Sequence, residues 1–185
     1  DWSSDVCSSD LESTLNGHHG SIIDVASSAD GRSFASCGED NIVIKWDSHL
    51  PQAFSTTVYE RPFSCVALSA DGRTLASGDE DGMVHIWDMP TGVALHTSQG
   101  HEGSPKIGAI RLPGGVAGIT LSVDGQTLAS CGHDQTVRVW HARTGKTIQI
   151  LRGHEGKVLS VSLSASGPIV AFVVDDKAVR LWNAL

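Results

Sequence analysis

The 185-residue sequence lacks the features that define several large classes of protein. It has no run of lysine or arginine and a formal net charge of −8, so a phosphate-binding surface for nucleic acid is not expected. No apolar stretch approaches the ~20 residues of a membrane span, so no membrane partner is expected. Proline is scarce, whereas 20 glycines indicate many short turns. Hydrophobic residues make up 40% of the chain, which suits one domain with a substantial core.

Patterns of metal-ligating and redox-active residues are also missing. The 4 cysteines form no CxxC pair and the 9 histidines form no HExxH motif, so we expect no metal site and no cofactor. Cys37 and Cys131 hold equivalent positions in two repeats, which lie too far apart for a disulfide. We expect both cysteines to be small, buried apolar residues.

Residues 1–11 show no apolar periodicity. They resemble the translation of a common short-read sequencing adapter, and the alternative interpretation is a leader rich in Ser and Asp. In both cases we expect a disordered, non-native stretch outside the fold. The true N-terminus and any signal peptide would then be missing. The sequence therefore does not indicate the compartment, and the cytoplasm is only the default expectation.

An internal repeat organises the rest of the sequence. Four tryptophans recur, and an aspartate stands six residues before each of them. A serine stands ten residues before the tryptophan in three copies, and Phe172 replaces it in the fourth. A Gly-His dipeptide precedes three copies, whereas Tyr59 holds the matching position in the second. The recurring residues are His18, Ser36, Asp40 and Trp46; Ser77, Asp81 and Trp87; His101, Ser130, Asp134 and Trp140; and His154, Asp176 and Trp182.

Within each copy the pattern is that of short antiparallel strands. Residues 64–88 alternate apolar and polar side chains with a period of two. Further turns at 80–82 and 91–92 give four strands in about 40 residues, which is one blade of a β-propeller. Asp-Gly pairs mark a tight hairpin in three copies, at Asp30-Gly31, Asp71-Gly72 and Asp124-Gly125.

The recurring Gly-His, Ser, Asp and Trp positions resemble the WD-repeat β-propeller family over residues 12–185. The Trp-Asp ending is present after Trp46 and Trp87, but His141 and Asn183 replace the aspartate in the last two copies. The resemblance implies an all-β fold of four-stranded antiparallel blades, with repeats at about 12–50, 51–95, 96–147 and 148–185. It also implies that the recurring His, Ser, Asp and Trp form a hydrogen-bonded network inside each blade. The second blade lacks the histidine and the fourth lacks the serine, so we expect both to be held more by packing.

Propellers of this family usually close with about seven blades. This sequence supplies four repeats, and the fourth ends before its outermost strand. We therefore expect a propeller fragment, an open arc rather than a closed ring, whose natural partners include missing blades of a parent chain. Residues 11–17 are expected to form a strand of the preceding blade. The two ends of such an arc expose apolar faces and unpaired strand edges.

A Ser, a His and an Asp in one copy also suggest a nucleophilic triad. A catalytic triad occurs once, whereas these residues recur with the spacing of the blades, so we expect no catalytic residues and no enzyme. The innermost strands offer one carboxylate, Asp24, and one lysine, which do not make a catalytic constellation. The predicted function is a non-catalytic protein-protein interaction scaffold. The alternative is part of a propeller enzyme or cofactor-binding propeller whose site lies in missing blades.

The upper propeller face, where WD propellers typically engage partners, carries the candidate binding residues. The residue before each turn aspartate should point to that face. Because these residues are mostly acidic, they favour a basic peptide as the partner. The alternative is that they are ordinary solvent-exposed acidic residues, which are common in turns. The insertion of the third copy, within 102–114, is either a binding loop or a tolerated, functionless one. The partner is another protein or peptide of unknown identity. The candidates are Glu39, Glu80, His133 and Asp175 in the turns, Lys106 and Arg111 in the insertion, and Lys157 and Leu159 on an innermost strand.

Overall fold

The computed structural model describes residues 14–58, 60–102, 106–107, 110–111, 114–165, 169–175 and 178–183. The adapter-like leader, residues 1–11, lies outside this part of the chain. The described residues form antiparallel strands joined by tight turns, and none of them belongs to a helix that could cross a membrane.

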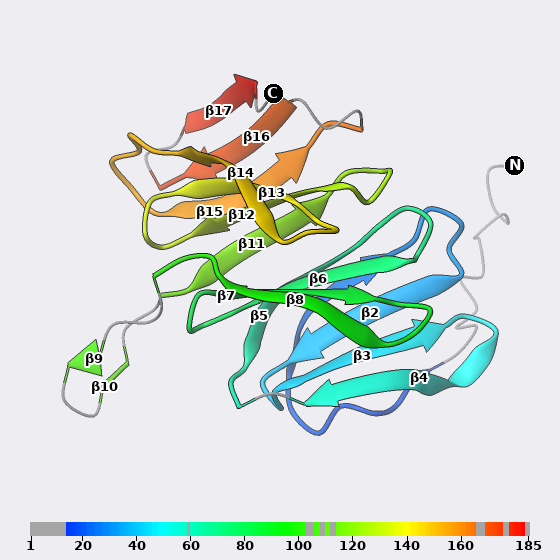
Figure 1. The fold of residues 1–185 in the computed structure, drawn as a ribbon. Coiled ribbons are helices and arrows are strands. Elements are labelled where there is room, and N and C mark those ends of the chain that lie inside the picture. The colour runs from blue at the N-terminus through cyan, green and yellow to red at the C-terminus, as the bar shows by residue number, and fades with distance from the viewer. Residues whose placement is uncertain are drawn as a thin grey trace, which may run out of the picture.

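Of the 17 described strands, 15 form four sheets in chain order, which we call blades 1 to 4 (Figure 1). Blade 1 consists of β1 (Ile22–Ser27), β2 (Ser33–Gly38), β3 (Ile42–Asp47) and β4 (Leu50–Val58). Blade 2 consists of β5 (Phe63–Leu68), β6 (Thr74–Asp79), β7 (Met83–Asp88) and β8 (Val93–Gln99). Blade 3 consists of β11 (Val116–Leu121), β12 (Thr127–Gly132), β13 (Val137–His141) and β14 (Lys146–Leu151). Blade 4 has three described strands, β15 (Val158–Leu163), β16 (Ile169–Val174) and β17 (Ala178–Asn183).

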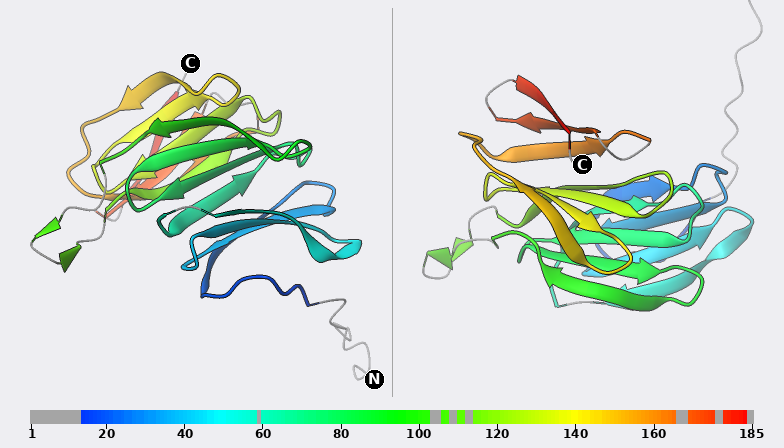
Figure 2. Two further views of the ribbon diagram at one scale, coloured as in Figure 1. Left: turned by 60° about the horizontal axis from the view of Figure 1, so that its bottom comes forward. Right: turned by 45° about the horizontal axis from the view of Figure 1, so that its top comes forward.

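The blades stand side by side and fan outward from their first strands (Figure 2). These first strands, β1, β5, β11 and β15, contact one another in chain order. The arrangement is an open arc and not a closed ring, as the sequence predicts.

Three clusters of buried side chains fill the spaces between successive blades. Because side chains alternate along a strand, each blade presents one face to the preceding blade and the other to the following blade. We call these the proximal face, which carries the repeat tryptophan, and the distal face. Between blades 1 and 2, the distal face of blade 1 supplies Ala35, Cys37 and Val43, and the proximal face of blade 2 supplies Phe63, Leu75 and Trp87.

The hairpin between the first two strands has the same hydrogen bonds in blades 1, 2 and 3. In blade 3, the Ser122 hydroxyl donates to Asp124 at 2.5 Å and accepts the Thr127 N–H at 2.9 Å. Gly125 adopts a φ of 65°, which glycine tolerates without strain. Ser28 and Ser69 make the equivalent bonds in blades 1 and 2. The repeated Asp-Gly pair therefore marks a turn that is held by a serine two residues before the aspartate.

The expected strand at residues 11–17 is wrong where it can be described, because residues 14–17 are not in a strand. A Cβ placed on Gly17 would lie 3.0 Å from the Trp46 ring and 3.2 Å from Ile44. The segment thus crosses the proximal face of blade 1, and no described strand pairs with it.

The insertion of the third copy contains a hairpin of two short strands, β9 (Lys106–Ile107) and β10 (Ile110–Arg111). Its register pairs Ile107 with Ile110 and Lys106 with Arg111. The hairpin projects away from the four blades (Figure 1).

Candidate functional site at the upper end of the blades

The turns between the second and third strands lie at the same end of the blades as the connections that lead into each first strand. We call this the upper end. Backbone hydrogen bonds join the two segments in three blades, from Glu39 N–H to Ser21 O at 2.9 Å, from His133 N–H to Gly115 O at 3.2 Å, and from Asp175 N–H to Lys157 O at 3.1 Å. The upper turns are therefore fixed to the inner strands of the arc.

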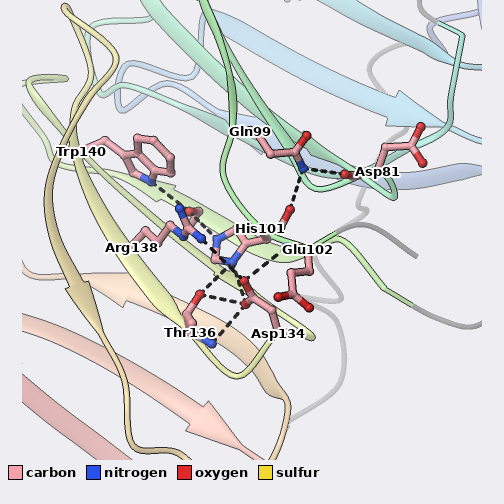
Figure 3. A network of polar contacts seen from close by, with 9 residues as sticks. Asp81, Gln99, His101, Glu102, Asp134, Thr136, Arg138 and Trp140 are labelled. Carbon is pink, nitrogen blue, oxygen red and sulfur yellow. Dashed lines mark hydrogen bonds and ion pairs between the residues drawn. The ribbon is translucent and has the colours of Figure 1, made fainter. Parts of the chain in front are cut away.

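In blade 3, a chain of hydrogen bonds runs from the buried tryptophan to the upper turn (Figure 3). The Trp140 indole N–H donates to Ser130 Oγ at 2.9 Å, and Ser130 Oγ lies 2.8 Å from His101 Nε2. His101 Nδ1 lies 2.9 Å from Asp134 Oδ1. Because a carboxylate only accepts, a neutral His101 carries its proton on Nδ1, and the Ser130 hydroxyl donates to Nε2.

Blade 1 contains the same chain of contacts. The Trp46 indole N–H donates to Ser36 Oγ at 2.8 Å, and Ser36 Oγ lies 2.7 Å from His18 Nε2. His18 Nδ1 lies 2.9 Å from Asp40 Oδ2. In blades 1 and 3, these hydrogen bonds thus connect the third strand to the upper turn.

The aspartates of these networks are held in the charged form. Burial opposes ionisation of Asp134, but the hydrogen bond and electrostatic interaction with the His101 ring, together with the Thr136 hydroxyl and the Glu102 N–H, outweigh it and lower the pKa from 3.8 to about 2. Burial likewise acts against the charge of Asp40, yet the N–H of His19 and the ring of His18 lower the pKa of that carboxyl. Both aspartates therefore anchor their upper turns as carboxylates at neutral pH.

The Ser, His and Asp of these networks have the connectivity of a nucleophilic triad, but they are not accessible. Ser130 is fully buried and Ser36 is 4% exposed. Each Oγ also accepts a tryptophan N–H, so a substrate carbonyl has no approach to it. Catalysis by a triad requires an exposed nucleophile next to an oxyanion site, whereas this geometry serves to join strands.

Blade 2, which lacks the histidine and is expected to be held more by packing, contains polar contacts of its own. Its upper-turn residue Asp81 forms an ion pair with Arg61 at 3.1 Å, where both side chains are partly exposed. A different buried pair is present, because His85 Nε2 lies 3.1 Å from Asp79 Oδ2. The His85 ring stacks on Trp87, with 5.6 Å between centroids and 16° between planes. The sequence motif did not reveal this pair, which lies at other positions of the repeat.

The steric cause of this difference is visible at the last residue of the second strand. Blades 1 and 3 have Gly38 and Gly132 there, and blade 2 has Asp79. A Cβ on Gly132 would lie 2.6 Å from His101 Nδ1, and one on Gly38 would lie 3.2 Å from His18 Nδ1. A side chain at this position would therefore overlap the imidazole as it is placed in blades 1 and 3, whereas blade 4, with Val174 at this position, holds its His154 against Phe172 instead.

A cavity of about 570 Å³ opens beside the upper turn of blade 2. Three carboxylate residues, Glu60, Asp79 and Asp81, line it together with Arg61 and His85. Gln99, at the end of β8, donates from Nε2 to the carbonyl oxygens of Asp81 and His101, which lie 2.9 and 2.7 Å away (Figure 3). This bridge fixes the upper turn of blade 2 to the entry of blade 3.

Blade 4 keeps the Gly-His histidine with different neighbours. His154 is buried, and its ring packs edge-on against Phe172 at a centroid distance of 4.6 Å and against Trp182 at 6.1 Å. Phe172 occupies the serine position, so an aromatic contact stands in place of the hydroxyl. The predicted network residue Asp176 lies outside the described residues.

The candidate partner-binding residues lie at or near the upper end. Glu39, Glu80 and Asp175 are exposed, whereas His133 is half-buried. Lys157, which directly precedes the inner strand β15, is exposed, and Leu159 within that strand is 46% exposed. Lys106 and Arg111 are paired in the register of the projecting hairpin β9–β10.

The inner strands and the cysteines serve the packing of the blades. Asp24 joins blades 1 and 2, because its Oδ2 accepts the Val66 N–H at 2.9 Å. Cys37, Cys65 and Cys131 are free and buried, and burial raises the pKa of all three thiols, to about 12 for Cys37 and Cys131. Among the residues that the structure describes, no three His, Cys, Asp or Glu side chains group as metal ligands.

Known proteins share both the repeats and the fold. The WD40 family, described as WD domain, G-beta repeat, matches residues 9–47, 54–88, 92–141 and 145–183. Among solved structures, that of U3-55K is similar with a TM-score of 0.76 and 25% identity, covering 91% of this chain and 50% of that chain. The WD40 repeats of RRP9 are similar with a TM-score of 0.74 and 25% identity, covering 91% and 49%.

Shorter matches occur among curated proteins. The nuclear distribution protein PAC1 of Gibberella zeae is 41% identical over 61 residues, which is 32% of this chain and 12% of that protein. PAC1 of Coccidioides posadasii is 38% identical over 61 residues, with the same coverage. The chain thus spans about half of the solved chains and a small part of these curated relatives.

The radiating antiparallel sheets and their repeated polar networks define a repeat protein of the β-propeller class. Within that class, the chain belongs to the WD40 family and represents a partial propeller. WD40 propellers are typically non-catalytic interaction scaffolds.

Proposed function

We propose that this chain is a scaffold that binds a basic segment of another protein at the upper end of its blades. The observation that carries the proposal is the repeated exposure of an acidic side chain on the upper turns. Glu39, Glu80 and Asp175 hold the same position in three blades, and all three are exposed. Acidic side chains on a rigid frame attract lysine and arginine side chains and set their spacing.

Two properties of the upper end favour such a partner. The turns are held by backbone bonds to the inner strands and, in blades 1 and 3, by buried carboxylates, so little ordering is needed when a partner binds. Among the carboxylates that line the cavity of blade 2, Asp79 and Asp81 already pair with His85 and Arg61, so Glu60 is the one that a lysine or arginine side chain of the partner suits. The remaining candidates, His133, Lys106, Arg111, Lys157 and Leu159, would supply neutral, basic and apolar contacts around the acidic turns.

Binding of synthetic peptides tests the proposal directly. A fluorescent peptide rich in Lys and Arg is titrated with the chain, and a Glu-rich peptide of equal length is the comparison. We expect only the basic peptide to bind. The double variant Glu39→Gln and Glu80→Gln should weaken binding by roughly tenfold, because each lost charge contact contributes up to about 1 kcal/mol.

The matched control carries the same change in net charge at the lower end of the blades. Ser48→Lys and Gln126→Lys are both exposed positions in or beside lower turns. Equal weakening by this control and by the upper-end variant would show only a general charge effect and would contradict the proposed site. Equal binding of the Glu-rich peptide would contradict the basic partner.

A further inference from the structure

A cavity of about 370 Å³ lies between blades 2 and 3 at their lower end, opposite the upper turns. Its walls are the β5–β6 hairpin and the strands β7 and β8 of blade 2, with the β11–β12 and β13–β14 turns of blade 3. Blades 2 and 3 each contact a blade on both sides. The cavity is therefore internal to the arc and does not involve either of its end faces.

Two close contacts between the blades fix the shape of this cavity. Near the inner strands, a Cβ on Gly125 would lie 3.1 Å from Ser69 Cβ, so the lower turn of blade 3 rests on that of blade 2. At the outer strand β8, His96 Nε2 lies 2.9 Å from the carbonyl oxygen of Arg143. A Cβ on Gly145 would lie 2.8 Å from the His96 ring. The walls are thus in place before a ligand binds, which lowers the cost of binding.

Arg73 lines the cavity without the carboxylate partner that its equivalent has in blade 1. There, Arg32 Nε donates to Asp47 Oδ2 at 3.5 Å. The matching aspartate of blade 2 is Asp88, and its Oδ2 accepts both the hydroxyl and the N–H of Thr91 instead. Among the residues that the structure describes, none forms an ion pair or a hydrogen bond with the Arg73 guanidinium.

A second arginine reaches the same cavity from blade 3. Arg143 stands in the turn between β13 and β14, and its side chain lines the cavity while its carbonyl oxygen holds His96. Its guanidinium also has no ion pair or hydrogen bond within the described part of the chain. Two guanidinium groups from successive blades thus face one cavity. Their planar array of N–H donors matches the two oxygens of a carboxylate.

Three aspartates in the same lining limit how much negative charge a ligand can carry. Asp71 and Asp124 each accept a serine hydroxyl and a backbone N–H within their own hairpins. Asp88 is likewise engaged by its own turn. These fixed charges repel a phosphate dianion or a run of glutamates more strongly than a single carboxylate. Leu95, which is 38% exposed, adds an apolar part to the lining.

We propose that this cavity binds a single Glu or Asp side chain of a partner protein. The carboxylate accepts hydrogen bonds from Arg73 and Arg143, and an apolar residue next to it in the partner packs on Leu95. This site is separate from the acidic upper end and prefers the opposite charge. Each of the two sites can therefore be tested without the other.

Titration of the isotope-labelled 185-residue chain with a short peptide, followed by NMR, tests this inference. The probe is the peptide Ser-Gly-Leu-Glu-Gly-Ser with both ends blocked, and the same peptide with Gln in place of Glu is the comparison. We expect saturable shifts of the Arg73 side-chain N–H and the Gly125 backbone N–H with the Glu peptide only. Arg73→Gln and Arg143→Gln should each weaken binding by about fivefold, because each removes one contact with the carboxylate.

The matched control is Arg32→Gln, which removes the same charge at the same position of blade 1, where the arginine already pairs with Asp47. It should leave binding of the Glu peptide unchanged. Arg73→Lys keeps the charge but not the planar group, and it should weaken binding by about twofold. The Glu39→Gln and Glu80→Gln double variant of the upper end should bind the peptide as the wild type does.

Four outcomes would overturn the inference. Equal shifts with the Gln peptide would show that no carboxylate is recognised, and equal weakening by Arg32→Gln would show only a general charge effect. Loss of binding in the upper-end variant would place the peptide elsewhere. Tighter binding of a phosphoserine peptide of the same length would contradict the preference for a single carboxylate. Both arginines are exposed, so the variants should fold, and their NMR spectra report this directly.

Discussion

Ser130 and Ser77 occupy the same position in their blades, but they have different surroundings. Ser130 Oγ accepts the Trp140 N–H and contacts His101, whereas Ser77 Oγ is buried with no hydrogen-bond partner among the described residues. The cause is the absence of the Gly-His histidine from blade 2. A buried hydroxyl without a hydrogen-bond partner destabilises the fold, whereas a hydroxyl at the centre of a hydrogen-bonded network stabilises it.

We predict that Ser130→Ala lowers the free energy of unfolding by about 1–3 kcal/mol, because the Trp140 N–H and His101 Nε2 lose their partner. Ser77→Ala removes an unpartnered hydroxyl and should leave stability unchanged or raise it slightly. Urea denaturation followed by tryptophan fluorescence measures both variants. Equal destabilisation would mean that the hydroxyl of Ser77 has a stabilising role that the structure does not explain.

The residues of the networks in blades 1 and 3 were predictable from the sequence, but the pair of blade 2 was not. His85 and Asp79 lie outside the recurring motif, and their contact depends on how β6 and β7 place them. The available clue was that one copy lost its histidine, replaced a glycine by Asp79 and gained His85. That coincidence does not by itself give a distance, so the pairing had to come from the structure.

Among the strands, the end of β12 is set by the space that His101 needs. A Cβ on Gly132 would lie 2.6 Å from His101 Nδ1 and 2.9 Å from Gly115 O. We predict that Gly132→Ala destabilises the chain by about 1–3 kcal/mol through this overlap. In a His101→Ala background the added cost should be smaller, and a double-mutant cycle in urea measures the coupling. Strict additivity of the two changes would contradict the steric explanation.

Strands were predictable where their pattern is local, and less so where they depend on a partner. Period-two alternation and Asp-Gly turns are properties of a short window, and they located β5 to β7 and their equivalents. No described strand pairs with residues 14–17, and Gly17 lies against the Trp46 side chain instead. The hairpin β9–β10 also lay in a segment that the sequence presented only as a loop.

For the whole molecule, the buried cysteines report on the packing of the blades. Cys37 lies between blades 1 and 2, Cys65 between blades 2 and 3, and Cys131 between blades 3 and 4. Their raised pKa values keep the thiols protonated at pH 8, so alkylation requires that an interface opens. The chain therefore carries one natural probe for each interface.

We predict that alkylation under native conditions modifies Cys131 first and Cys65 last. Repeats contact only their neighbours, so a terminal blade separates more readily than an internal one, and blade 4 has only three described strands. Peptide mass spectrometry during a time course with iodoacetamide measures the three rates, and Cys7→Ser removes the fourth thiol. Identical rates at all three sites would instead show that the blades open as one unit.

The open arc and the apolar character of its ends followed from counting repeats, but the residues that form those end surfaces did not. Their composition became clear only when Val179 and Ile22 could be compared with buried equivalents in other blades. Repeat number is a property of the sequence, whereas the burial of a residue depends on which blade lies beside it.

The overlap between a Gly-His imidazole placed as in blades 1 and 3 and a side chain at the position of Asp79 has an evolutionary consequence for blade 2. A lineage that converts blade 2 to the arrangement of blades 1 and 3 must gain a histidine and lose Asp79. If the histidine comes first, the two side chains overlap, and if Asp79 is lost first, His85 loses its carboxylate partner. Both single steps pass through a less stable ancestor. Exchange of whole blades by recombination avoids these intermediates, so blades of this kind should be inherited as complete units.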